Sequence, residues 1–470
     1  MDWFSRFLAQ ANDFLYSNIL VALLVLTGLY FTVRTKFVQI RMVPEALRVL
    51  LEKTEKGGVS SFQALMISTA SRVGTGNIAG VATAIAAGGP GAIFWMWLLA
   101  VIGGASAFVE STLAQVYKIR DGDGFRGGPA YYIEKALGQR WLGVVFACLL
   151  IACFAFGFNA LQSYNVSSAF AYYVEGYGST AIPAIVGAVL AVCTALVIFG
   201  GVHRIGVITS KVVPFMALLY IALGLYITVS NAAQLPGVFQ TVFAQAFDFR
   251  AIFGGFAGSC VMHGIKRGLF SNEAGMGSAP NAGAAADVSH PAKQGMVQML
   301  SVFIDTLIIC TTTAMMLLVY GSASGDLTGI PFVQQAVRAE IGEAGIHFIT
   351  VSIFLFAFSS LIGNYCYAES NLMFIKDNKA LLFLFRCAAV LVVFFGAQAS
   401  FSTVWDLADV LMGLMAIVNI AAILLLGNIA VKTLNDYTRQ KKQGEDPVFH
   451  PEKLGIRRTE CWGDPGQKME

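Results

Sequence analysis

Charged residues are scarce in this sequence. Asp, Glu, Lys and Arg together make up 13% of the 470 residues, whereas 56% are hydrophobic and the mean hydropathy is +0.68. A soluble domain needs a more polar surface, so this composition indicates a membrane protein with several spans. The formal net charge of +3 requires no nucleic-acid partner.

Residues that carry catalysis or bind metal clusters are also few. There are five His and eight scattered Cys, with no HExxH, GxSxG or CxxC motif. An intramembrane enzyme would need a nucleophile with a base, or a metal cluster. We therefore expect no enzyme activity and no organic cofactor, and we interpret the Cys as small buried hydrophobic residues.

What the sequence has instead is long apolar runs. Eleven are long enough to cross a hydrocarbon core of about 30 Å. They cover roughly 14–33, 60–87, 91–117, 141–163, 180–199, 207–230, 251–274, 294–320, 347–373, 380–396 and 405–427. The predicted fold is an all-α polytopic membrane protein with about 11 transmembrane helices.

The basic residues predict an orientation. Of the 31 Lys and Arg, 27 fall in loops on one side or in the tail after residue 428. By the positive-inside rule that side is cytoplasmic, which places the N-terminus outside and the C-terminus inside the plasma membrane.

The spacing of the segments repeats. Segments two to six and seven to eleven start 191 to 206 residues apart, in the same order. Because five is an odd number, the second copy enters the membrane from the opposite face, as in many secondary transporters. We expect an extra helix and amphipathic loop in 1–59, repeats in 60–230 and 251–427, and a partly disordered cytoplasmic tail in 428–470.

The most informative feature is an interruption of the second segment. Residues 74–80 read Gly-Thr-Gly-Asn-Ile-Ala-Gly. Irregular backbone survives at membrane depth only where it is buried or lines a cavity. The free amides of Thr75, Gly76 and Asn77 would suit a carboxylate, and freed carbonyls would suit an ammonium or Na⁺. A small-residue helix-packing face is the alternative interpretation.

The first break lies about fourteen residues after the start of the second segment. The same count from Ala251, the start of the seventh segment, predicts a second break at Met262, His263 and Gly264, at the same depth in the membrane. The glycine-rich run 272–280 would then lie near the cytoplasmic surface as a gate or cap. His263 could tune binding with pH or could be structural.

Several charged residues lie within or beside the spans. A carboxylate at membrane depth marks a pathway by default, so Glu110 and Asp305 are predicted to act in gating or coupling. Glu273, together with Lys266 and Arg267, is expected close to the cytoplasmic face, either as part of an inner gate or as a solvated helix end. Glu110 could instead pair with a basic loop residue. For Arg72 we expect an ion pair with Glu273 or Asp305 rather than contact with substrate.

Two motifs resemble a known family. The run GTGNIAGVATAIAAG followed by GPGAIFWMW, together with SNEAGMGSAPNA at 271–282, is similar to the bacterial alanine or glycine:cation symporters, also called sodium:alanine symporters. The resemblance implies the five-plus-five inverted-repeat fold of leucine-transporter-like symporters, with a discontinuous first helix in each repeat and one extra N-terminal helix. It also implies Na⁺-driven uptake of small neutral amino acids such as alanine and glycine.

The resemblance implies site residues as well. Besides the region 262–264, the amino acid would contact Gly74, Thr75, Gly76, Asn77, Gln162 and Asn364. Sodium would lie between carbonyls near Ala70 and Val73 and the hydroxyls of Ser359 and Ser360, because hard oxygen donors suit such a cation. Asn364 replaces a frequent Trp of the family, which makes glutamine a further candidate substrate.

Two other functions remain open from the sequence. Proton coupling could use Glu110, Asp305 or His263. A channel would need a ring of charged or carbonyl groups, usually from several subunits, and the sequence contains no sign of one. The sequence predicts no oligomeric state.

Overall fold

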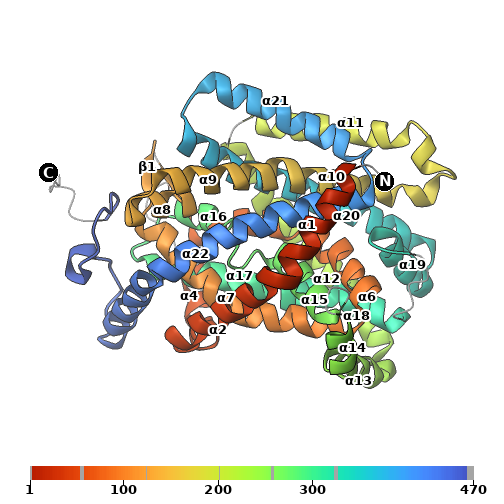
Figure 1. Cartoon of the computed structure of the whole chain (residues 1–470), viewed down its shortest axis with the longest axis horizontal. Helices are drawn as coiled ribbons and strands as arrows, with labels where there is room; N and C mark the ends of the chain where they lie inside the picture. The colour runs from red at the N-terminus through yellow and green to blue at the C-terminus, as the bar shows by residue number, and fades with distance from the viewer. Residues whose placement is uncertain are drawn as a thin grey trace.

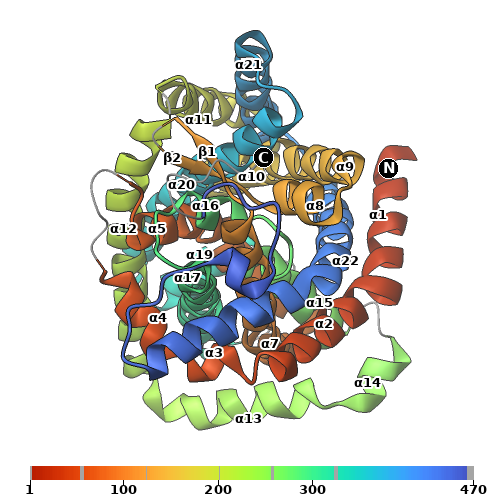
Figure 2. The same ribbon diagram turned by 90° about the vertical axis from the view of Figure 1, so that its left-hand side faces the viewer.

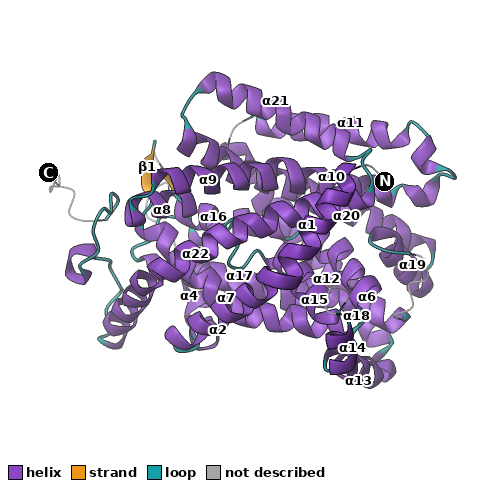
Figure 3. Ribbon diagram, viewed as in Figure 1, coloured by secondary structure: helices purple, strands orange, loops and turns teal. Residues whose placement is uncertain are grey.

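The computed structural model describes residues 3–52, 58–122, 124–200, 202–255, 259–321 and 327–462. These residues are almost entirely helical (Figure 3). Within them, the strands are β1 (Ile119–Asp121) and β2 (Gly124–Arg126), which form one antiparallel hairpin. The prediction of an all-α membrane protein is confirmed.

The helices follow the predicted order. The N-terminal part contains α1 (Trp3–Leu15), η1 (Tyr16–Leu20), α2 (Val21–Arg34), α3 (Val38–Arg41) and α4 (Val43–Leu50). The first repeat contains α5 (Ser61–Arg72), η2 (Gly76–Gly80), α6 (Val81–Gly88), α7 (Gly91–Val116), α8 (Pro129–Leu137), α9 (Arg140–Ile151), η3 (Ala152–Phe158), α10 (Asn159–Ala169), η4 (Ala171–Tyr173), η5 (Tyr177–Ser179), α11 (Ile182–Ile198) and α12 (Val202–Ser230).

The connection between the repeats contains η6 (Ala232–Gln234), α13 (Leu235–Ala246) and α14 (Phe249–Gly254). The second repeat contains α15 (Cys260–Asn272), α16 (Pro280–Ala285), α17 (Pro291–Phe303), η8 (Ile304–Cys310), α18 (Thr311–Tyr320), α19 (Ile330–Ile341), α20 (Glu343–Ile375), α21 (Lys379–Gly396) and α22 (Phe401–Lys442), and η9 (Pro451–Leu454) follows.

Eight helical stretches of the described residues are long and apolar enough to cross a membrane. The other three predicted spans are the interrupted helix α5–α6, the 17-residue α11 and the short α15. Helices α11 and α21 lie side by side at one edge of the bundle, where Gly187 packs against the carbonyl of Phe394 (Figures 1 and 2).

The first predicted break is confirmed. Helix α5 begins with a capping box between Ser60 and Gln63 and ends at Arg72. Val73 leaves helical geometry with ψ of 83°, and the helix resumes at Gly76. The segment 60–87 is therefore two half-helices joined at Val73–Thr75.

The second predicted break was misplaced. Met262, His263 and Gly264 lie in the first turns of the continuous helix α15, which Ser259 caps. The chain breaks instead at Glu273–Ala279, where Glu273, Gly275 and Gly277 have φ of 56°, 82° and 87°. The error arises because α14 is a separate helix, so the half-helix begins at Cys260 rather than at Ala251.

Both ends of the described part of the chain pack on the bundle. Helix α1 crosses α22 (Figure 1), and Asn12 Nδ2 of α1 donates to Asp406 Oδ1 of α22 at 2.7 Å. The tail was expected to be partly disordered, but α22 continues to Lys442. Beyond it, Phe449 N donates to Ser289 O at 3.0 Å, and Trp462 Nε1 donates to Gln115 O at 2.9 Å.

Candidate functional site

The first break holds two backbone amides whose partners are side-chain amides. Gly74 N donates to Asn77 Oδ1 at 3.0 Å, and Thr75 N donates to Gln162 Oε1 of α10 at 3.1 Å. Asn165, one turn after Gln162, donates to Thr75 Oγ1 at 3.0 Å. The structure thus brings the predicted residues Gly74, Thr75, Asn77 and Gln162 together in a buried position.

Glycine at the break allows close approach by other helices. A Cβ on Gly74 would lie 2.2 Å from Ser360 Oγ and 2.9 Å from Gln162 Nε2. A Cβ on Gly76 would lie 2.8 Å from the ring of Phe270. Real Cβ atoms do not occur at such distances, so a larger residue at either position would force Ser360, Gln162 or the Phe270 ring to shift.

Asn77 joins the first break to the second repeat. Its Nδ2 donates to Asp305 Oδ1 of η8 at 2.7 Å and to Ser271 Oγ of α15 at 3.1 Å. Ser271 Oγ in turn donates to Asp305 Oδ2 at 2.5 Å, and Thr313 Oγ1 donates to the Asn77 carbonyl at 2.6 Å. Sequence reasoning selected Asn77 and Asp305 separately and missed Ser271, which immediately precedes the Asn272–Glu273 step of the motif.

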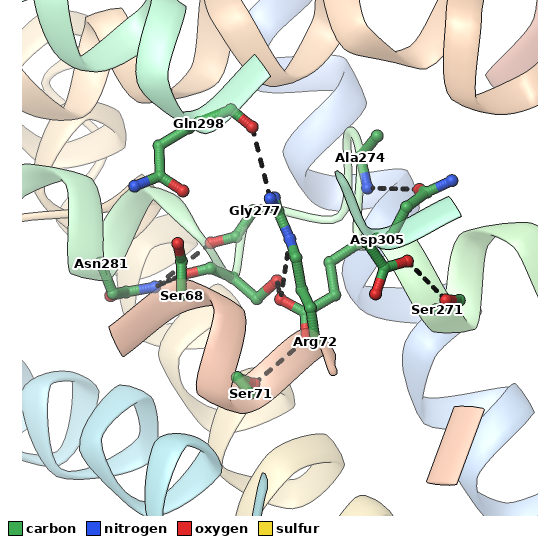
Figure 4. A network of polar contacts seen from close by, with 12 residues as sticks. Ser68, Ser71, Arg72, Ser271, Ala274, Gly277, Asn281, Gln298 and Asp305 are labelled. Carbon is green, nitrogen blue, oxygen red and sulfur yellow. Dashed lines mark hydrogen bonds and ion pairs between the residues drawn. The ribbon is translucent and has the colours of Figure 1, made fainter. Parts of the chain in front are cut away.

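Arg72 connects the two breaks directly. It reaches from the end of α5 toward the 273–279 loop and α17 (Figure 4). Its Nε lies 3.9 Å from Glu273 Oε2, and its Nη1 donates to the carbonyl of Gln298 at 3.3 Å. The predicted ion pair is confirmed with Glu273, whereas Asp305 is held by Asn77 and Ser271.

Glu273 is not at the surface, contrary to expectation. Only 1% of it is exposed, and it opens the second break. Ser278 Oγ donates to its Oε2 at 2.6 Å, and Ser71 Oγ lies 3.1 Å from its Oε1. Ser71 Oγ also donates to Asn364 Oδ1 at 2.7 Å, which places the predicted residue Asn364 beside the break.

Glu110 reaches the same loop from α7. Its Oε1 accepts from the backbone N–H of Gly275 at 3.2 Å, and its Oε2 accepts from Asn419 Nδ2 of α22 at 2.7 Å. The alternative that Glu110 pairs with a basic loop residue is wrong. Within the described residues, its carboxylate accepts from Gly275 and Asn419 and makes no ion pair. Glu110, Glu273 and Asp305, which the sequence presented as scattered, are therefore all linked by hydrogen bonds to residues of the two breaks.

Two of the predicted sodium ligands meet. Ser360 Oγ donates to the Ala70 carbonyl at 3.1 Å and lies against Gly74. Ser359 Oγ instead donates to Phe356 O of its own helix at 2.9 Å. Carbonyl and hydroxyl oxygens are the donors that a hard cation prefers, so the pair Ala70 and Ser360 fits Na⁺, whereas Ser359 faces elsewhere.

Residues 262–264 lie far from the first break. A Cβ on Gly88, at the end of α6, would lie 2.8 Å from His263 Cβ, and Gly264 packs on Ala92 and Trp95. At 1.5 Å per residue, Gly264 is about 13 Å along α15 from the second break. Met262 and Lys266 instead line a separate pocket with residues of α1.

An aromatic and ionic cluster covers the break on the α15 side. The ring of Phe270 lies 4.8 Å from Phe158 and 5.3 Å from Trp405, measured between centroids. Arg267 donates to both carboxylate oxygens of Asp409 at 3.1 and 2.6 Å and stacks 4.3 Å from the Trp405 ring. Sequence reasoning put Lys266 and Arg267 near the cytoplasmic face because it misplaced the break.

Residues 1–451 match the sequence profile of the sodium:alanine symporter family. The chain belongs to this family. It is similar to the amino-acid carrier protein AlsT of Bacillus subtilis, with 49% identity over 99% of both chains. It also resembles two other proteins of that organism. The probable sodium/glutamine symporter GlnT is 48% identical, over 96% of this chain and 95% of the relative. The putative sodium/proton-dependent alanine carrier YrbD is 42% identical, over 97% of each.

A solved structure supports the fold. The transporter MhsT in complex with L-phenylalanine matches with a TM-score of 0.57 over 81% of this chain and 96% of that chain, at 15% identity. The inverted-repeat architecture expected from the resemblance is thereby confirmed. At this identity the likeness concerns the fold alone.

Proposed function

We propose that this family member imports small neutral amino acids, alanine or glycine first, by Na⁺-coupled symport with alternating access. The observation that carries the proposal is the pairing of the Thr75 N–H with Gln162 Oε1 at a helix break. An acceptor oxygen already sits where a substrate carboxylate would bind, at the positive end of a half-helix.

The substrate would lie between the two breaks. Its carboxylate would meet the amides of Gly74, Thr75 and Gly76 after Gln162 turns aside, and its ammonium group would face carbonyls or the carboxylate of Glu273. Phe270, packed against Gly76 and Trp405, would limit the size of the substrate side chain. Asn364, bonded to Ser71 and to Asn159 Oδ1 at 3.0 Å, would accept a side-chain amide if glutamine is carried.

Sodium would bind at the Ala70 carbonyl and the Ser360 hydroxyl, with the Val73 carbonyl as a further donor. This site adjoins the amino-acid site, because Ser360 Oγ lies against Gly74. A bound cation would hold α20 to the end of α5 and would fix the shape of the break. Ion and substrate would then strengthen each other's binding, which is the physical basis of coupling.

Two clusters would act as gates. On the α15 side, Arg267 pairs with Asp409. On the α16 side, Glu110 holds the N–H of Gly275. Access would alternate as one cluster opens while the other stays closed, with Arg72, Glu273, Asn77 and Asp305 connecting them.

The plasma membrane of a bacterium is the expected location, with the N-terminus outside and the C-terminus inside. Lys266 and Arg267 lie within α15 rather than in a loop, yet the large excess of basic residues on the predicted cytoplasmic side remains. The positive-inside rule therefore gives the same orientation.

Uptake of labelled alanine, glycine and glutamine into proteoliposomes tests the proposal. An inward Na⁺ gradient should drive accumulation, and replacing Na⁺ by choline at fixed pH and potential should abolish it. Proton coupling is the second candidate, because the buried carboxylates Asp305 and Glu110 could carry a proton. The relative YrbD is also named as a putative sodium/proton-dependent alanine carrier. Accumulation driven by a pH gradient without Na⁺ would favour it.

A further inference from the structure

A strongly basic pocket lies away from the transport site. It is a cavity of about 460 Å³ between the turn that follows α2 and the last two turns of α22. Four of its lining residues are cations, and the others carry amide or hydroxyl groups. The basic pocket is lined by Lys36, Arg41, Arg439 and Lys442 together with Asn435, Thr438 and Gln443.

The positive charge of the basic pocket is only partly compensated. No carboxylate is among its lining residues. Arg439 pairs with Asp436 on its own helix, and Arg41 donates to the carbonyl of Thr35 at 3.4 Å. Within the described residues, the ammonium groups of Lys36 and Lys442 make no ion pair or hydrogen bond. The pocket can therefore accept an anion without breaking an existing contact.

The surface next to the basic pocket is apolar. Phe37 and Ile40 are 53% and 62% exposed, and Leu51 at the end of α4 is 83% exposed. On α22, Leu425 is 72% exposed. Leu425 belongs to the membrane-spanning stretch that contains α22, and Phe37 and Ile40 closely follow the stretch that ends at Arg34, so this apolar surface adjoins two spans. A cationic cavity beside an apolar surface matches an amphiphile with an anionic head.

The turn between α2 and α3 separates the two kinds of contact. Lys36 and Phe37 both have left-handed backbone, with φ of 55° and 57°, which residues other than glycine rarely adopt. This turn places Lys36 in the basic pocket and leaves Phe37 exposed on the apolar side.

We propose that the basic pocket binds the headgroup of an anionic phospholipid, with its acyl chains against Phe37 and Ile40. Basic clusters at the cytoplasmic ends of spans attract such lipids in general. The concave shape of the basic pocket and its two unpaired lysines favour one lipid bound at a defined position over general attraction of anionic lipids to the basic surface. Free phosphate could satisfy the cations but would gain nothing from the apolar side chains.

Native mass spectrometry and thermal unfolding of the purified full-length protein test this proposal. We expect one retained phosphatidylglycerol and a rise in melting temperature on adding phosphatidylglycerol, with little effect of phosphatidylcholine. Lys36→Gln, Arg41→Gln, Arg439→Gln and Lys442→Gln combined should weaken the phosphatidylglycerol effect at least tenfold in lipid concentration.

The matched control changes four exposed basic residues outside the basic pocket: Arg120, Lys376, Lys453 and Arg457, each to Gln. This control should keep the phosphatidylglycerol effect. An equal loss in the control would overturn the proposal in favour of diffuse charge attraction. Equal stabilisation by inorganic phosphate would overturn it in favour of a soluble anion.

If the fourfold variant does not fold, Lys36→Gln and Lys442→Gln can be measured singly, because neither side chain has a partner to lose. An unchanged phosphatidylglycerol effect in both would contradict the proposal. None of these readouts depends on transport, so failure here leaves the proposed symport untouched.

Discussion

Arg72 and Glu273 face each other from the two helix breaks, with Arg72 Nε 3.9 Å from Glu273 Oε2 and both side chains almost fully buried. One residue ends the first half-helix of repeat one, and the other follows the first half-helix of repeat two. Their ion pair is therefore a direct link between the elements that must move against each other.

Removing one partner of this pair should be more harmful than removing both. Arg72→Gln or Glu273→Gln leaves a buried charge without its counter-ion, which costs about 3–5 kcal/mol in comparable pairs. The double variant should recover part of that loss. Thermal unfolding of the three variants in detergent measures the coupling, and strictly additive losses would show that the pair is not an energetic unit.

Gln162 should control substrate affinity. Gln162→Glu keeps an acceptor oxygen for the Thr75 N–H but adds a negative charge that repels the substrate carboxylate. We expect alanine affinity to fall at least tenfold, about 1.4 kcal/mol. Thermal stability should also fall, because Gln162 is only 3% exposed and the added charge is buried without a counter-ion.

Ser163→Ala is the matched control for Gln162, because Ser163 lies on the same helix but donates to Val393 O of α21 at 2.6 Å. Equilibrium binding of labelled alanine should be normal in this control. Normal binding in Gln162→Glu as well would remove Gln162 from the substrate site.

The first break could be predicted because its signal is local. Three glycines and a polar pair in an apolar segment have no other explanation than irregular backbone or close packing, and both occur at residues 74–80. The second break required the correct helix start. Gly254 and Gly255 followed by Ser259 are the helix-start signal for α15 in the sequence.

The contacts between the repeats could not be predicted. Asp305 bonds to Ser271, 34 residues away, and Arg267 bonds to Asp409, 142 residues away. Such pairs depend on how half-helices cross, which periodicity does not specify. An intramembrane carboxylate indicates that a partner exists, but the fold decides which one.

The docked tail can be tested through Cys461, whose thiol donates to the Lys118 carbonyl at 3.3 Å. The neighbouring Trp462 packs on Phe449, with 5.2 Å between the two ring centroids. Trp462→Ala should release the segment and speed maleimide labelling of Cys461 severalfold. Trp141→Ala, which removes a 65% exposed indole elsewhere, should leave the rate unchanged. Equal rates in both variants would mean that Trp462 does not hold the tail.

Docking of the tail should also depend on pH. Burial is the main cause that lowers the pKa of Lys118 to about 8, and the nearby Arg120 lowers it further. Cys461 and Asp287 act in the opposite direction and raise it. Release of the tail exposes Lys118 and returns its pKa toward about 10.4. The released state then binds more protons between these values, so a rise from about pH 7 to about pH 9 favours docking. Proteolysis of the tail should slow over this range in the native protein but not in Lys118→Gln.

The two neighbouring serines of α20 separate the ion from the substrate. Ser360 donates to the Ala70 carbonyl, whereas Ser359 donates along its own helix to Phe356. Ser360→Ala should therefore raise the Na⁺ concentration for half-maximal uptake several-fold while changing the apparent alanine constant much less at saturating Na⁺. Ser359→Ala should leave both nearly unchanged.

Because linkage is reciprocal, saturating alanine should partly restore Na⁺ affinity in Ser360→Ala. Normal Na⁺ dependence in Ser360→Ala would move the search for the ion to the carboxylates around Asn77, whereas an equal effect of both serines would indicate that Ser359 turns toward the ion when it binds.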